Sequence, residues 1–120
     1  MFNNDYIMRE IENLSKAAVR FFKKDIITIE IFDEQENISD SGFLYYRLKK
    51  LIQDRKINEA EDLLFEEVER NRSKEHLKVA IAFFKDLNEL TDETLLNCDY
   101  SRNEIYEGIQ AVQKYYRTPK

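Results

Sequence analysis

The chain has 120 residues, which fits a single domain, and 42% of them are hydrophobic, enough to form a core without disulfides or a metal. Its formal net charge of -5 argues against nucleic acid as a partner, because phosphate binding needs concentrated Lys and Arg. With only two glycines and one proline, the chain lacks the turn residues of a β-sheet, so the composition predicts an all-α fold.

The cellular setting is predicted from cysteine usage and from the lack of targeting signals. Cys98 is the only cysteine, so no intramolecular disulfide can form. The sequence shows no secretory signal and no long apolar run. We therefore expect one helical domain over residues 1–120, located in the cytoplasm.

The first predicted element is a long N-terminal helix within residues 1–24, capped by Asn4 or Asp5. Its apolar residues alternate between spacings of four and three, which is a heptad pattern. This seam comprises Ile7, Ile11, Leu14, Ala18 and Phe21. It packs either on the chain's own hairpins or on a second copy. A seam of about 15 residues is longer than one short hairpin covers, which favours a homodimer.

Residues 25–41 are predicted to form an acidic connector. Its first half is rich in β-branched and aromatic residues and partly alternates, as a strand would. A single strand would leave its backbone unpaired, so we expect a helical continuation or an extended segment packed on the bundle. Four carboxylates then follow without an intervening basic residue, which is typical of a solvated loop.

Residues 42–120 are predicted to form two antiparallel helical hairpins. Helices are expected at about 43–55, from Asn58 onward, after the cap Ser73, and after the capping box of Ser101 and Glu104, with a short helical turn before the last. Each of these four helices places one large apolar residue at the centre of its inner face. We expect these residues to share one core: Leu48, Leu64, Ile81 and Ile109.

The hairpins partly match a tetratricopeptide-like repeat, without its Gly in the first helix and its Pro at the repeat end. Leu44, Leu48 and Leu51 recur 33 positions later as Leu77, Ile81 and Phe84, close to the period of 34 of such repeats. If the hairpins stack in this way, their first helices line a groove. The groove is predicted to contain Tyr45, Lys49, Gln53, Lys78, Ala82 and Lys85. Its three lysines would form a basic patch suited to an acidic peptide or a free C-terminal carboxylate.

The N-terminal sequence carries a family resemblance. Asp5-Tyr6-Ile7-Met8-Arg9-Glu10-Ile11-Glu12 resembles the opening of a family of short bacterial proteins known only as a domain of unknown function. The resemblance implies an all-α fold with a long first helix ahead of helical hairpins, and a bacterial cytoplasmic origin. It implies no catalytic residues.

No motif of an active site, a cofactor site or a metal site is present in the sequence. His76, the only histidine, is expected to be partly exposed in the first turn of its helix, and Cys98 to be a buried structural thiol. One His and one Cys cannot form a structural zinc site, and Glu66, Glu67 and Glu69 wrap around their helix rather than converge. We therefore expect a protein that is not an enzyme and has no cofactor.

The function predicted from these features is protein–protein interaction by a small helical module. Its partner would be a protein or an acidic peptide, with a homodimer as one arrangement. One alternative is a peripheral membrane protein that binds through its N-terminal helix, where residues 17–24 mix apolar bulk with cations. The net negative charge opposes that alternative, since anionic lipid would repel it. Another alternative, an enzyme with a carboxylate site, has no motif behind it.

Overall fold

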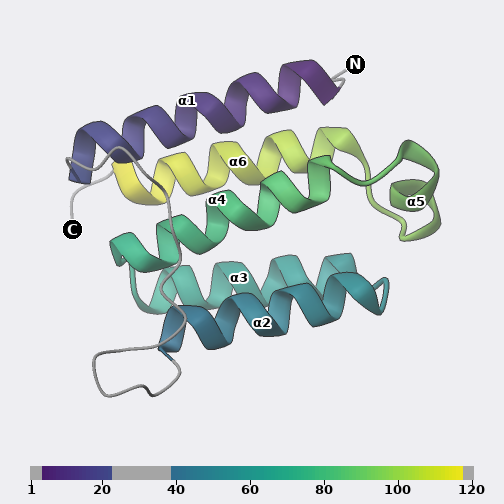
Figure 1. Ribbon diagram of the computed structural model, residues 1–120, viewed down its shortest axis with the longest axis horizontal. Coiled ribbons are helices and arrows are strands. Elements are labelled where there is room, and N and C mark those ends of the chain that lie inside the picture. The colour runs from purple at the N-terminus through teal and green to yellow at the C-terminus, as the bar shows by residue number, and fades with distance from the viewer. Residues whose placement is uncertain (1–3, 23–38, 118–120) are drawn as a thin grey trace.

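The computed structural model describes residues 4–22 and 39–117, which form six helices and no strand (Figure 1). The all-α prediction is therefore confirmed. The helices are α1 (Asn4–Phe22), α2 (Asp40–Gln53), α3 (Ile57–Arg70), α4 (Lys74–Asn88), α5 (Asp92–Asn97) and α6 (Arg102–Arg117).

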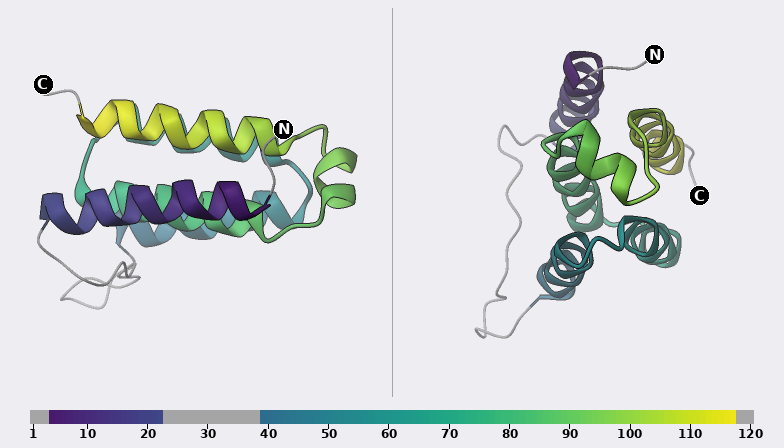
Figure 2. Two further views of the ribbon diagram at one scale, coloured as in Figure 1. Left: turned by 90° about the horizontal axis from the view of Figure 1, so that it is seen from above. Right: turned by 90° about the vertical axis from the view of Figure 1, so that its right-hand side faces the viewer.

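Helix α4 is the centre of the molecule and contacts α1, α2, α3 and α6. Seen end-on, α1, α4 and α2 form one row, and α6 and α3 form a second row beside it (Figure 2). The α2/α3 hairpin closes one end of this two-layered stack, and α1 with α6 closes the other. The short helix α5 lies at the tip, between the end of α4 and the start of α6.

Side-chain caps explain why several helices begin where they do. The Ser73 hydroxyl accepts a hydrogen bond from the His76 amide at 3.0 Å, and Ser101 and Glu104 bond reciprocally to each other's amides at 2.8 and 3.2 Å. The caps predicted at Ser73 and at Ser101 with Glu104 are confirmed. The start of α2 differs from the prediction, because Ser39 caps it and the helix begins at Asp40 rather than at about residue 43.

The predicted core is also confirmed. Leu48, Leu64, Ile81 and Ile109 are buried in one hydrophobic cluster that includes residues of every described helix. The spacing of apolar residues assigned each inner face correctly, because a helix side chain recurs on the same face every three or four residues.

The N-terminal seam packs within the chain. Ile7, Ile11 and Leu14 are buried in the common core, and α1 contacts α4 and α6. Gln110 of α6 donates a hydrogen bond to Glu10 at 2.9 Å, which fixes the pairing of these helices. The side chains of Ala18 and Phe21 lie outside the described part of the chain. Since its own helices cover the first three seam residues, these residues give no reason for a dimer through α1.

The connector prediction can be compared only at its end. Residues 25–38 lie outside the described residues. Residues 39–41, which the prediction placed in the connector, instead form the cap and the first turn of α2. The capping hydroxyl of Ser39 moves this boundary, because it satisfies the amide of Gly42.

Gly108 marks a close approach of α6 to α4. A Cβ at this position would lie 2.5 Å from the Cζ of the buried Phe84 ring. The glycine is therefore required by packing, although alanine is about 1 kcal/mol better in a helix.

We expect Gly108→Ala to lower the free energy of unfolding by about 1–2 kcal/mol, because the overpacking exceeds the gain in helix propensity. Urea denaturation followed by circular dichroism measures this change. Gln113→Ala on the same helix serves as the control and should be close to neutral. A stabilised Gly108→Ala variant would contradict the close packing of α4 and α6.

Candidate functional site

Helices α2 and α4 meet around one carboxylate on the face where the groove was predicted. The Tyr45 hydroxyl donates a hydrogen bond to Asp86 Oδ2 at 2.8 Å, and Lys49 Nζ lies 3.5 Å from the same oxygen. Burial and this hydrogen bond raise the pKa of Tyr45 above its ordinary value. The structure thus brings two predicted groove residues together, but around an acidic partner that the repeat pattern did not indicate.

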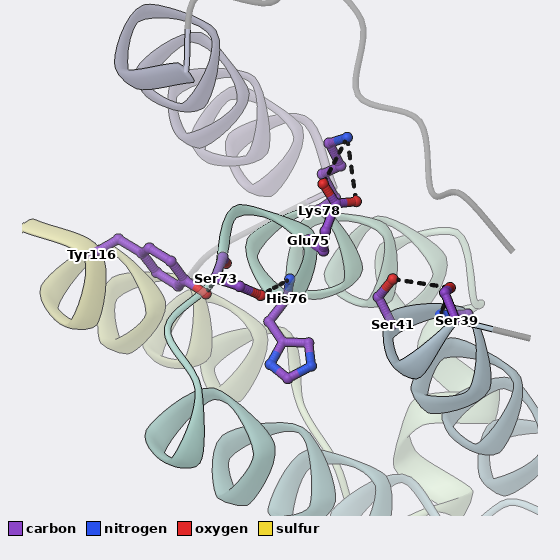
Figure 3. A network of polar contacts seen from close by, with 8 residues as sticks. Ser39, Ser41, Ser73, Glu75, His76, Lys78 and Tyr116 are labelled. Atoms are coloured by element: carbon purple, nitrogen blue, oxygen red, sulfur yellow. Dashed lines mark hydrogen bonds and ion pairs between the residues drawn. The ribbon is translucent and has the colours of Figure 1, made fainter. Parts of the chain in front are cut away.

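The other predicted groove residues are placed differently. Gln53 and Lys85 are exposed, and Ala82 is half-buried. Lys78 is only 5% exposed, and its Nζ lies 3.4 Å from a carboxylate oxygen of Glu75 (Figure 3). The prediction that Lys78 is an exposed groove lysine is therefore wrong. The reason is that α4 is packed against four other helices, which leaves little of its surface open.

The predicted basic patch is not present, because carboxylates offset two of its three lysines. Glu75 pairs with Lys78, and Asp86 pairs with Lys49. Glu89 lies close enough to Tyr45 that its charge also contributes to the raised pKa of that phenol, after burial and the Asp86 hydrogen bond. This surface is therefore mixed in charge, and long-range attraction of an acidic peptide is weak there.

The outward side of α2 has a different character. Phe43 is 51% exposed and Tyr46 is 65% exposed, and the Arg47 guanidinium lies 5.7 Å from the centre of the Phe43 ring. Positions i, i+3, i+4 and i+7 share one face of a helix, so Phe43, Tyr46, Arg47 and Lys50 form one surface, the α2 face. Of the neighbouring rings Tyr45 and Tyr46, the prediction placed Tyr45 on the groove surface. The structure instead exposes Tyr46, because Asp86 holds Tyr45 against α4.

His76 is buried at 3% exposure, so the expectation of partial exposure is wrong. Its Nδ1 lies 2.8 Å from the carbonyl oxygen of Asn71. The Tyr116 hydroxyl donates to the carbonyl of Ser73 at 2.6 Å, which brings α6 over the turn that precedes α4 (Figure 3). The histidine therefore serves to hold this turn, and its partner is a backbone carbonyl rather than a nucleophile.

The remaining sequence candidates serve structural roles. Cys98 is buried, as predicted. Glu67 pairs with Arg70, and Glu69 accepts a hydrogen bond from the Tyr115 hydroxyl at 2.7 Å. Within residues 4–22 and 39–117, no group of three or more His, Cys, Asp or Glu side chains is arranged to hold a metal ion. No described helix is long and apolar enough to cross a membrane, and residues 17–24 lie outside the described side chains.

A shallow cleft of about 350 Å³ lies at the end of α6, lined by Arg72, Ala111, Lys114 and Tyr115. Arg72 Nη1 donates to the carbonyl oxygen of Tyr115 at 3.3 Å, and its guanidinium lies 5.4 Å from the centre of the Tyr115 ring. Cations are favourable at this position because the last carbonyls of a helix carry partial negative charge. The C-terminus of α6 therefore explains the position of Arg72 in this cleft.

Among the described carboxylates, Glu61 is the one whose pKa is clearly shifted, and sequence reasoning did not single it out. Its Oε2 accepts a hydrogen bond from the Tyr100 hydroxyl at 2.5 Å. Burial raises the pKa of Glu61, nearby carboxylates such as Glu104 raise it further, and the Tyr100 hydrogen bond acts in the opposite direction. The two residues are 39 positions apart, so no local pattern in the sequence indicates the pair.

We expect Glu61→Gln to stabilise the protein at pH 7, by about 1 kcal/mol or less, because an amide oxygen still accepts from Tyr100 without the cost of a buried charge. A folded-state pKa above the unfolded one means that the protonated form adds stability, which is lost as pH rises through the folded pKa. The difference in free energy of unfolding between Glu61→Gln and the wild type should therefore shrink as the pH falls toward 4.

Thermal unfolding of both proteins across this pH range measures the difference. The control is Glu59→Gln, an exposed carboxylate on the same helix, which should show no such pH-dependent gain. A Glu61→Gln variant less stable than the wild type at pH 7 would show that the charged hydrogen bond outweighs burial.

Comparison with known protein families identifies one to which the chain belongs. The model of a family of unknown function (DUF6483) matches residues 1–117. No curated protein and no solved structure matches the chain. The resemblance to a domain-of-unknown-function family is thereby confirmed, and the surface of the chain itself is the guide to its role.

Proposed function

Because the chain belongs to the DUF6483 family of unknown function, we propose its role from its own surface: a non-enzymatic helical module that binds proteins through the α2 face. The observation that carries the proposal is the exposure of Phe43 and Tyr46 one turn apart on α2. Aromatic residues and Arg are enriched in the buried centres of protein interfaces and dominate their binding energy. Arg47 already lies over one of these rings, so its side chain is partly ordered before binding.

The charge of α2 indicates the chemistry of the partner. This helix contains three basic residues and one acidic residue, although the whole chain has a net charge of -5. The single acidic residue, Asp40, lies in the first turn, about two helical turns before Arg47. A guanidinium binds a carboxylate through two parallel hydrogen bonds, and a lysine acts as a point charge. The partner that fits is therefore an acidic segment with apolar side chains that cover the two rings.

The order of the helices agrees with this role. The α2/α3 hairpin packs against α4, with α2 beside α4 in one row and α3 beside α6 in the other (Figure 2), and this layering supports the proposal of a stacked helical module. Such stacks hold their helices rigid, so a docking face loses little conformational entropy when it binds. The acidic-peptide partner predicted from the sequence is retained, but it moves from the mixed-charge α2–α4 surface to the outward side of α2.

The proposal is tested by selecting peptides on the immobilised protein from a displayed random library. Enriched sequences should combine acidic residues with at least one large apolar residue. A synthetic peptide of the enriched type should bind the Phe43→Ser/Tyr46→Ser variant at least about tenfold more weakly, a loss of about 1.4 kcal/mol. The melting temperature should change little, since both rings are exposed.

Leu96→Ser is the matched control, because it removes an apolar side chain that is 76% exposed on α5, away from the α2 face. It should leave peptide binding unchanged. Enriched peptides that are not acidic, or that bind the double variant as well as the wild type, would overturn the proposal. So would binding to phosphatidylserine vesicles that depends on Phe43 and Tyr46 in the absence of peptide binding, since it would assign the face to a membrane.

A further inference from the structure

The α2/α3 end of the molecule has opposite charges on its two helices. Helix α3 contains six acidic residues and one basic residue, whereas α2 contains three basic residues and one acidic residue. Three of the α3 carboxylates are exposed at positions i, i+3 and i+7, which share one helix face: Glu59, Asp62 and Glu66, the α3 face. A basic helix with two aromatic rings thus lies beside an acidic helix at the end of the stack (Figure 1).

This end also differs from the opposite end in its apolar content. In α1, the exposed residues within the described side chains are polar or charged apart from Tyr6, which suits a terminal helix that faces water. In the α2/α3 hairpin, Phe43 is 51% exposed and Tyr46 is 65% exposed, whereas Tyr6 of α1 is 36% exposed. A terminal pair of helices that keeps such side chains accessible gains stability if another surface covers it.

We propose that the α2/α3 end binds a second copy of the same chain, with α2 of each copy lying on α3 of the other. The inference rests on the proposed function, because it uses the α2 face as a docking surface and names its partner. The second copy supplies the acidic segment with apolar residues that the α2 face fits, in the form of its own α3. A single two-fold axis relates the two copies, so the contact of the first α2 with the second α3 is repeated by the second α2 with the first α3.

Charge selects the symmetry of this dimer. If the two-fold axis lies in the interface and is perpendicular to the two helices, α2 meets α2 and α3 meets α3. Like charges then face each other in both contacts. If the axis runs along the hairpin, each basic α2 meets an acidic α3, and both contacts are attractive. The second arrangement is therefore favoured.

The antiparallel hairpin fixes which residues meet. Because the turn at 54–56 joins two helices of equal length, residue 47 lies level with residue 63, and residue 50 lies level with residue 60. A two-fold axis parallel to the helices leaves each residue at the same position along the helix direction in both copies. Arg47 of one copy thus lies between the levels of Glu59 and Glu66 of the other, and Lys50 lies beside Glu59.

The size of the face predicts a weak, salt-sensitive association. Two helices of 14 residues, about 21 Å long and about 10 Å apart, offer about 400 Å² per copy and about 800 Å² in total. This is less than the roughly 1,200–2,000 Å² of a stable interface, so we expect a reversible dimer that forms at high concentration. Added salt should dissociate it, because exposed charges are screened.

The test is a charge swap read by sedimentation of the full chain between about 10 µM and about 1 mM. The wild type should shift reversibly from monomer to dimer as concentration rises. Arg47→Glu/Lys50→Glu and Glu59→Lys/Glu66→Lys should each remain monomeric, since both contacts become repulsive. An equimolar mixture of the two variants should dimerise again, because one contact is then native and the other is complementary with its charges reversed.

Arg9→Glu/Lys16→Glu on α1 is the matched control: it makes the same change of charge at exposed positions of the other end and should dimerise like the wild type. A wild type that stays monomeric to about 1 mM would overturn the inference, and so would variants whose mixture does not associate. Growth beyond the dimer would overturn the two-fold arrangement.

Failure of this inference is distinguishable from failure of the proposed function. Glu59→Lys/Glu66→Lys leaves the α2 face intact and should still bind acidic peptides. A monomeric wild type whose peptide binding requires Phe43 and Tyr46 would retain the proposed function and remove the homodimer. A wild type that dimerises but selects no acidic peptide would retain the homodimer contact and restrict the α2 face to it.

Discussion

Arg102→Ala should lower the free energy of unfolding by about 3–5 kcal/mol, because this one side chain closes the end of α4. Its Nη1 donates to the carbonyl and the side-chain oxygen of Asn88 at 3.0 and 2.8 Å, and its Nη2 donates to the carbonyl of Leu90 at 2.8 Å. The last carbonyls of a helix have no partner within the helix, so Arg102 supplies donors that α4 itself lacks. Truncation removes those donors from a site where Asn88 is buried.

Two further variants test whether the planar set of guanidinium donors of Arg102 or its positive charge stabilises the end of α4. Arg102→Lys keeps the cation but not the planar set of donors, and should lose most of the same stability. Asp92→Ala removes only the exposed partner of Arg102 Nε, a carboxylate 87% exposed, and should cost less than about 1 kcal/mol. Urea denaturation measures all three variants. A loss below about 1 kcal/mol for Arg102→Ala would show that water replaces the guanidinium at the end of α4.

Phe84→Ala should cost about 3–5 kcal/mol, because the ring is fully buried on the central helix. Its ring packs edge-on against Phe83, with the ring centroids 5.0 Å apart. The centroid of the Phe65 ring lies 6.4 Å from that of Phe84. The Phe84 ring fills the space above Gly108. Removing it leaves a cavity where α3, α4 and α6 meet.

Gly108 gives this prediction an internal check. In the Phe84→Ala background, Gly108→Ala should be neutral or stabilising, because the added methyl group no longer meets the ring and the helix gains propensity. In a double-mutant cycle measured by urea denaturation, the double variant should therefore lose less free energy of unfolding than the sum of the two single losses. Additive effects of the two substitutions would mean that Phe84 and Gly108 do not share one packing site.

Local spacing in the sequence was sufficient to predict the helices and their buried faces. Ser73 and the pair Ser101 and Glu104 begin their helices as predicted, because a cap is made by side chains within three residues of the amides that they satisfy. Leu48 and Ile109 are buried because apolar side chains at helical spacing occupy one side of their helices. These features depend on neighbours along the chain, which the sequence contains.

The candidate site depended on neighbours that are distant along the chain. The sequence placed both Lys78 and Tyr45 on a groove. In the structure, Glu75 pairs with the buried Lys78, and Asp86, 41 positions after Tyr45, holds the Tyr45 ring against α4. Glu61 acquires its raised pKa from burial beside Tyr100, 39 positions away.

By itself, the sequence therefore determined that the chain is helical and which side of each helix is apolar, because helical periodicity is a local property, while the start of α2 was predicted about three residues late. Only the tertiary structure decided which polar side chains pair, and which part of α2 stays open. Burial and charge pairing depend on which helices pack together, and α4 packs against four of them at once. That packing leaves Phe43 and Tyr46 accessible and covers Lys78 and His76.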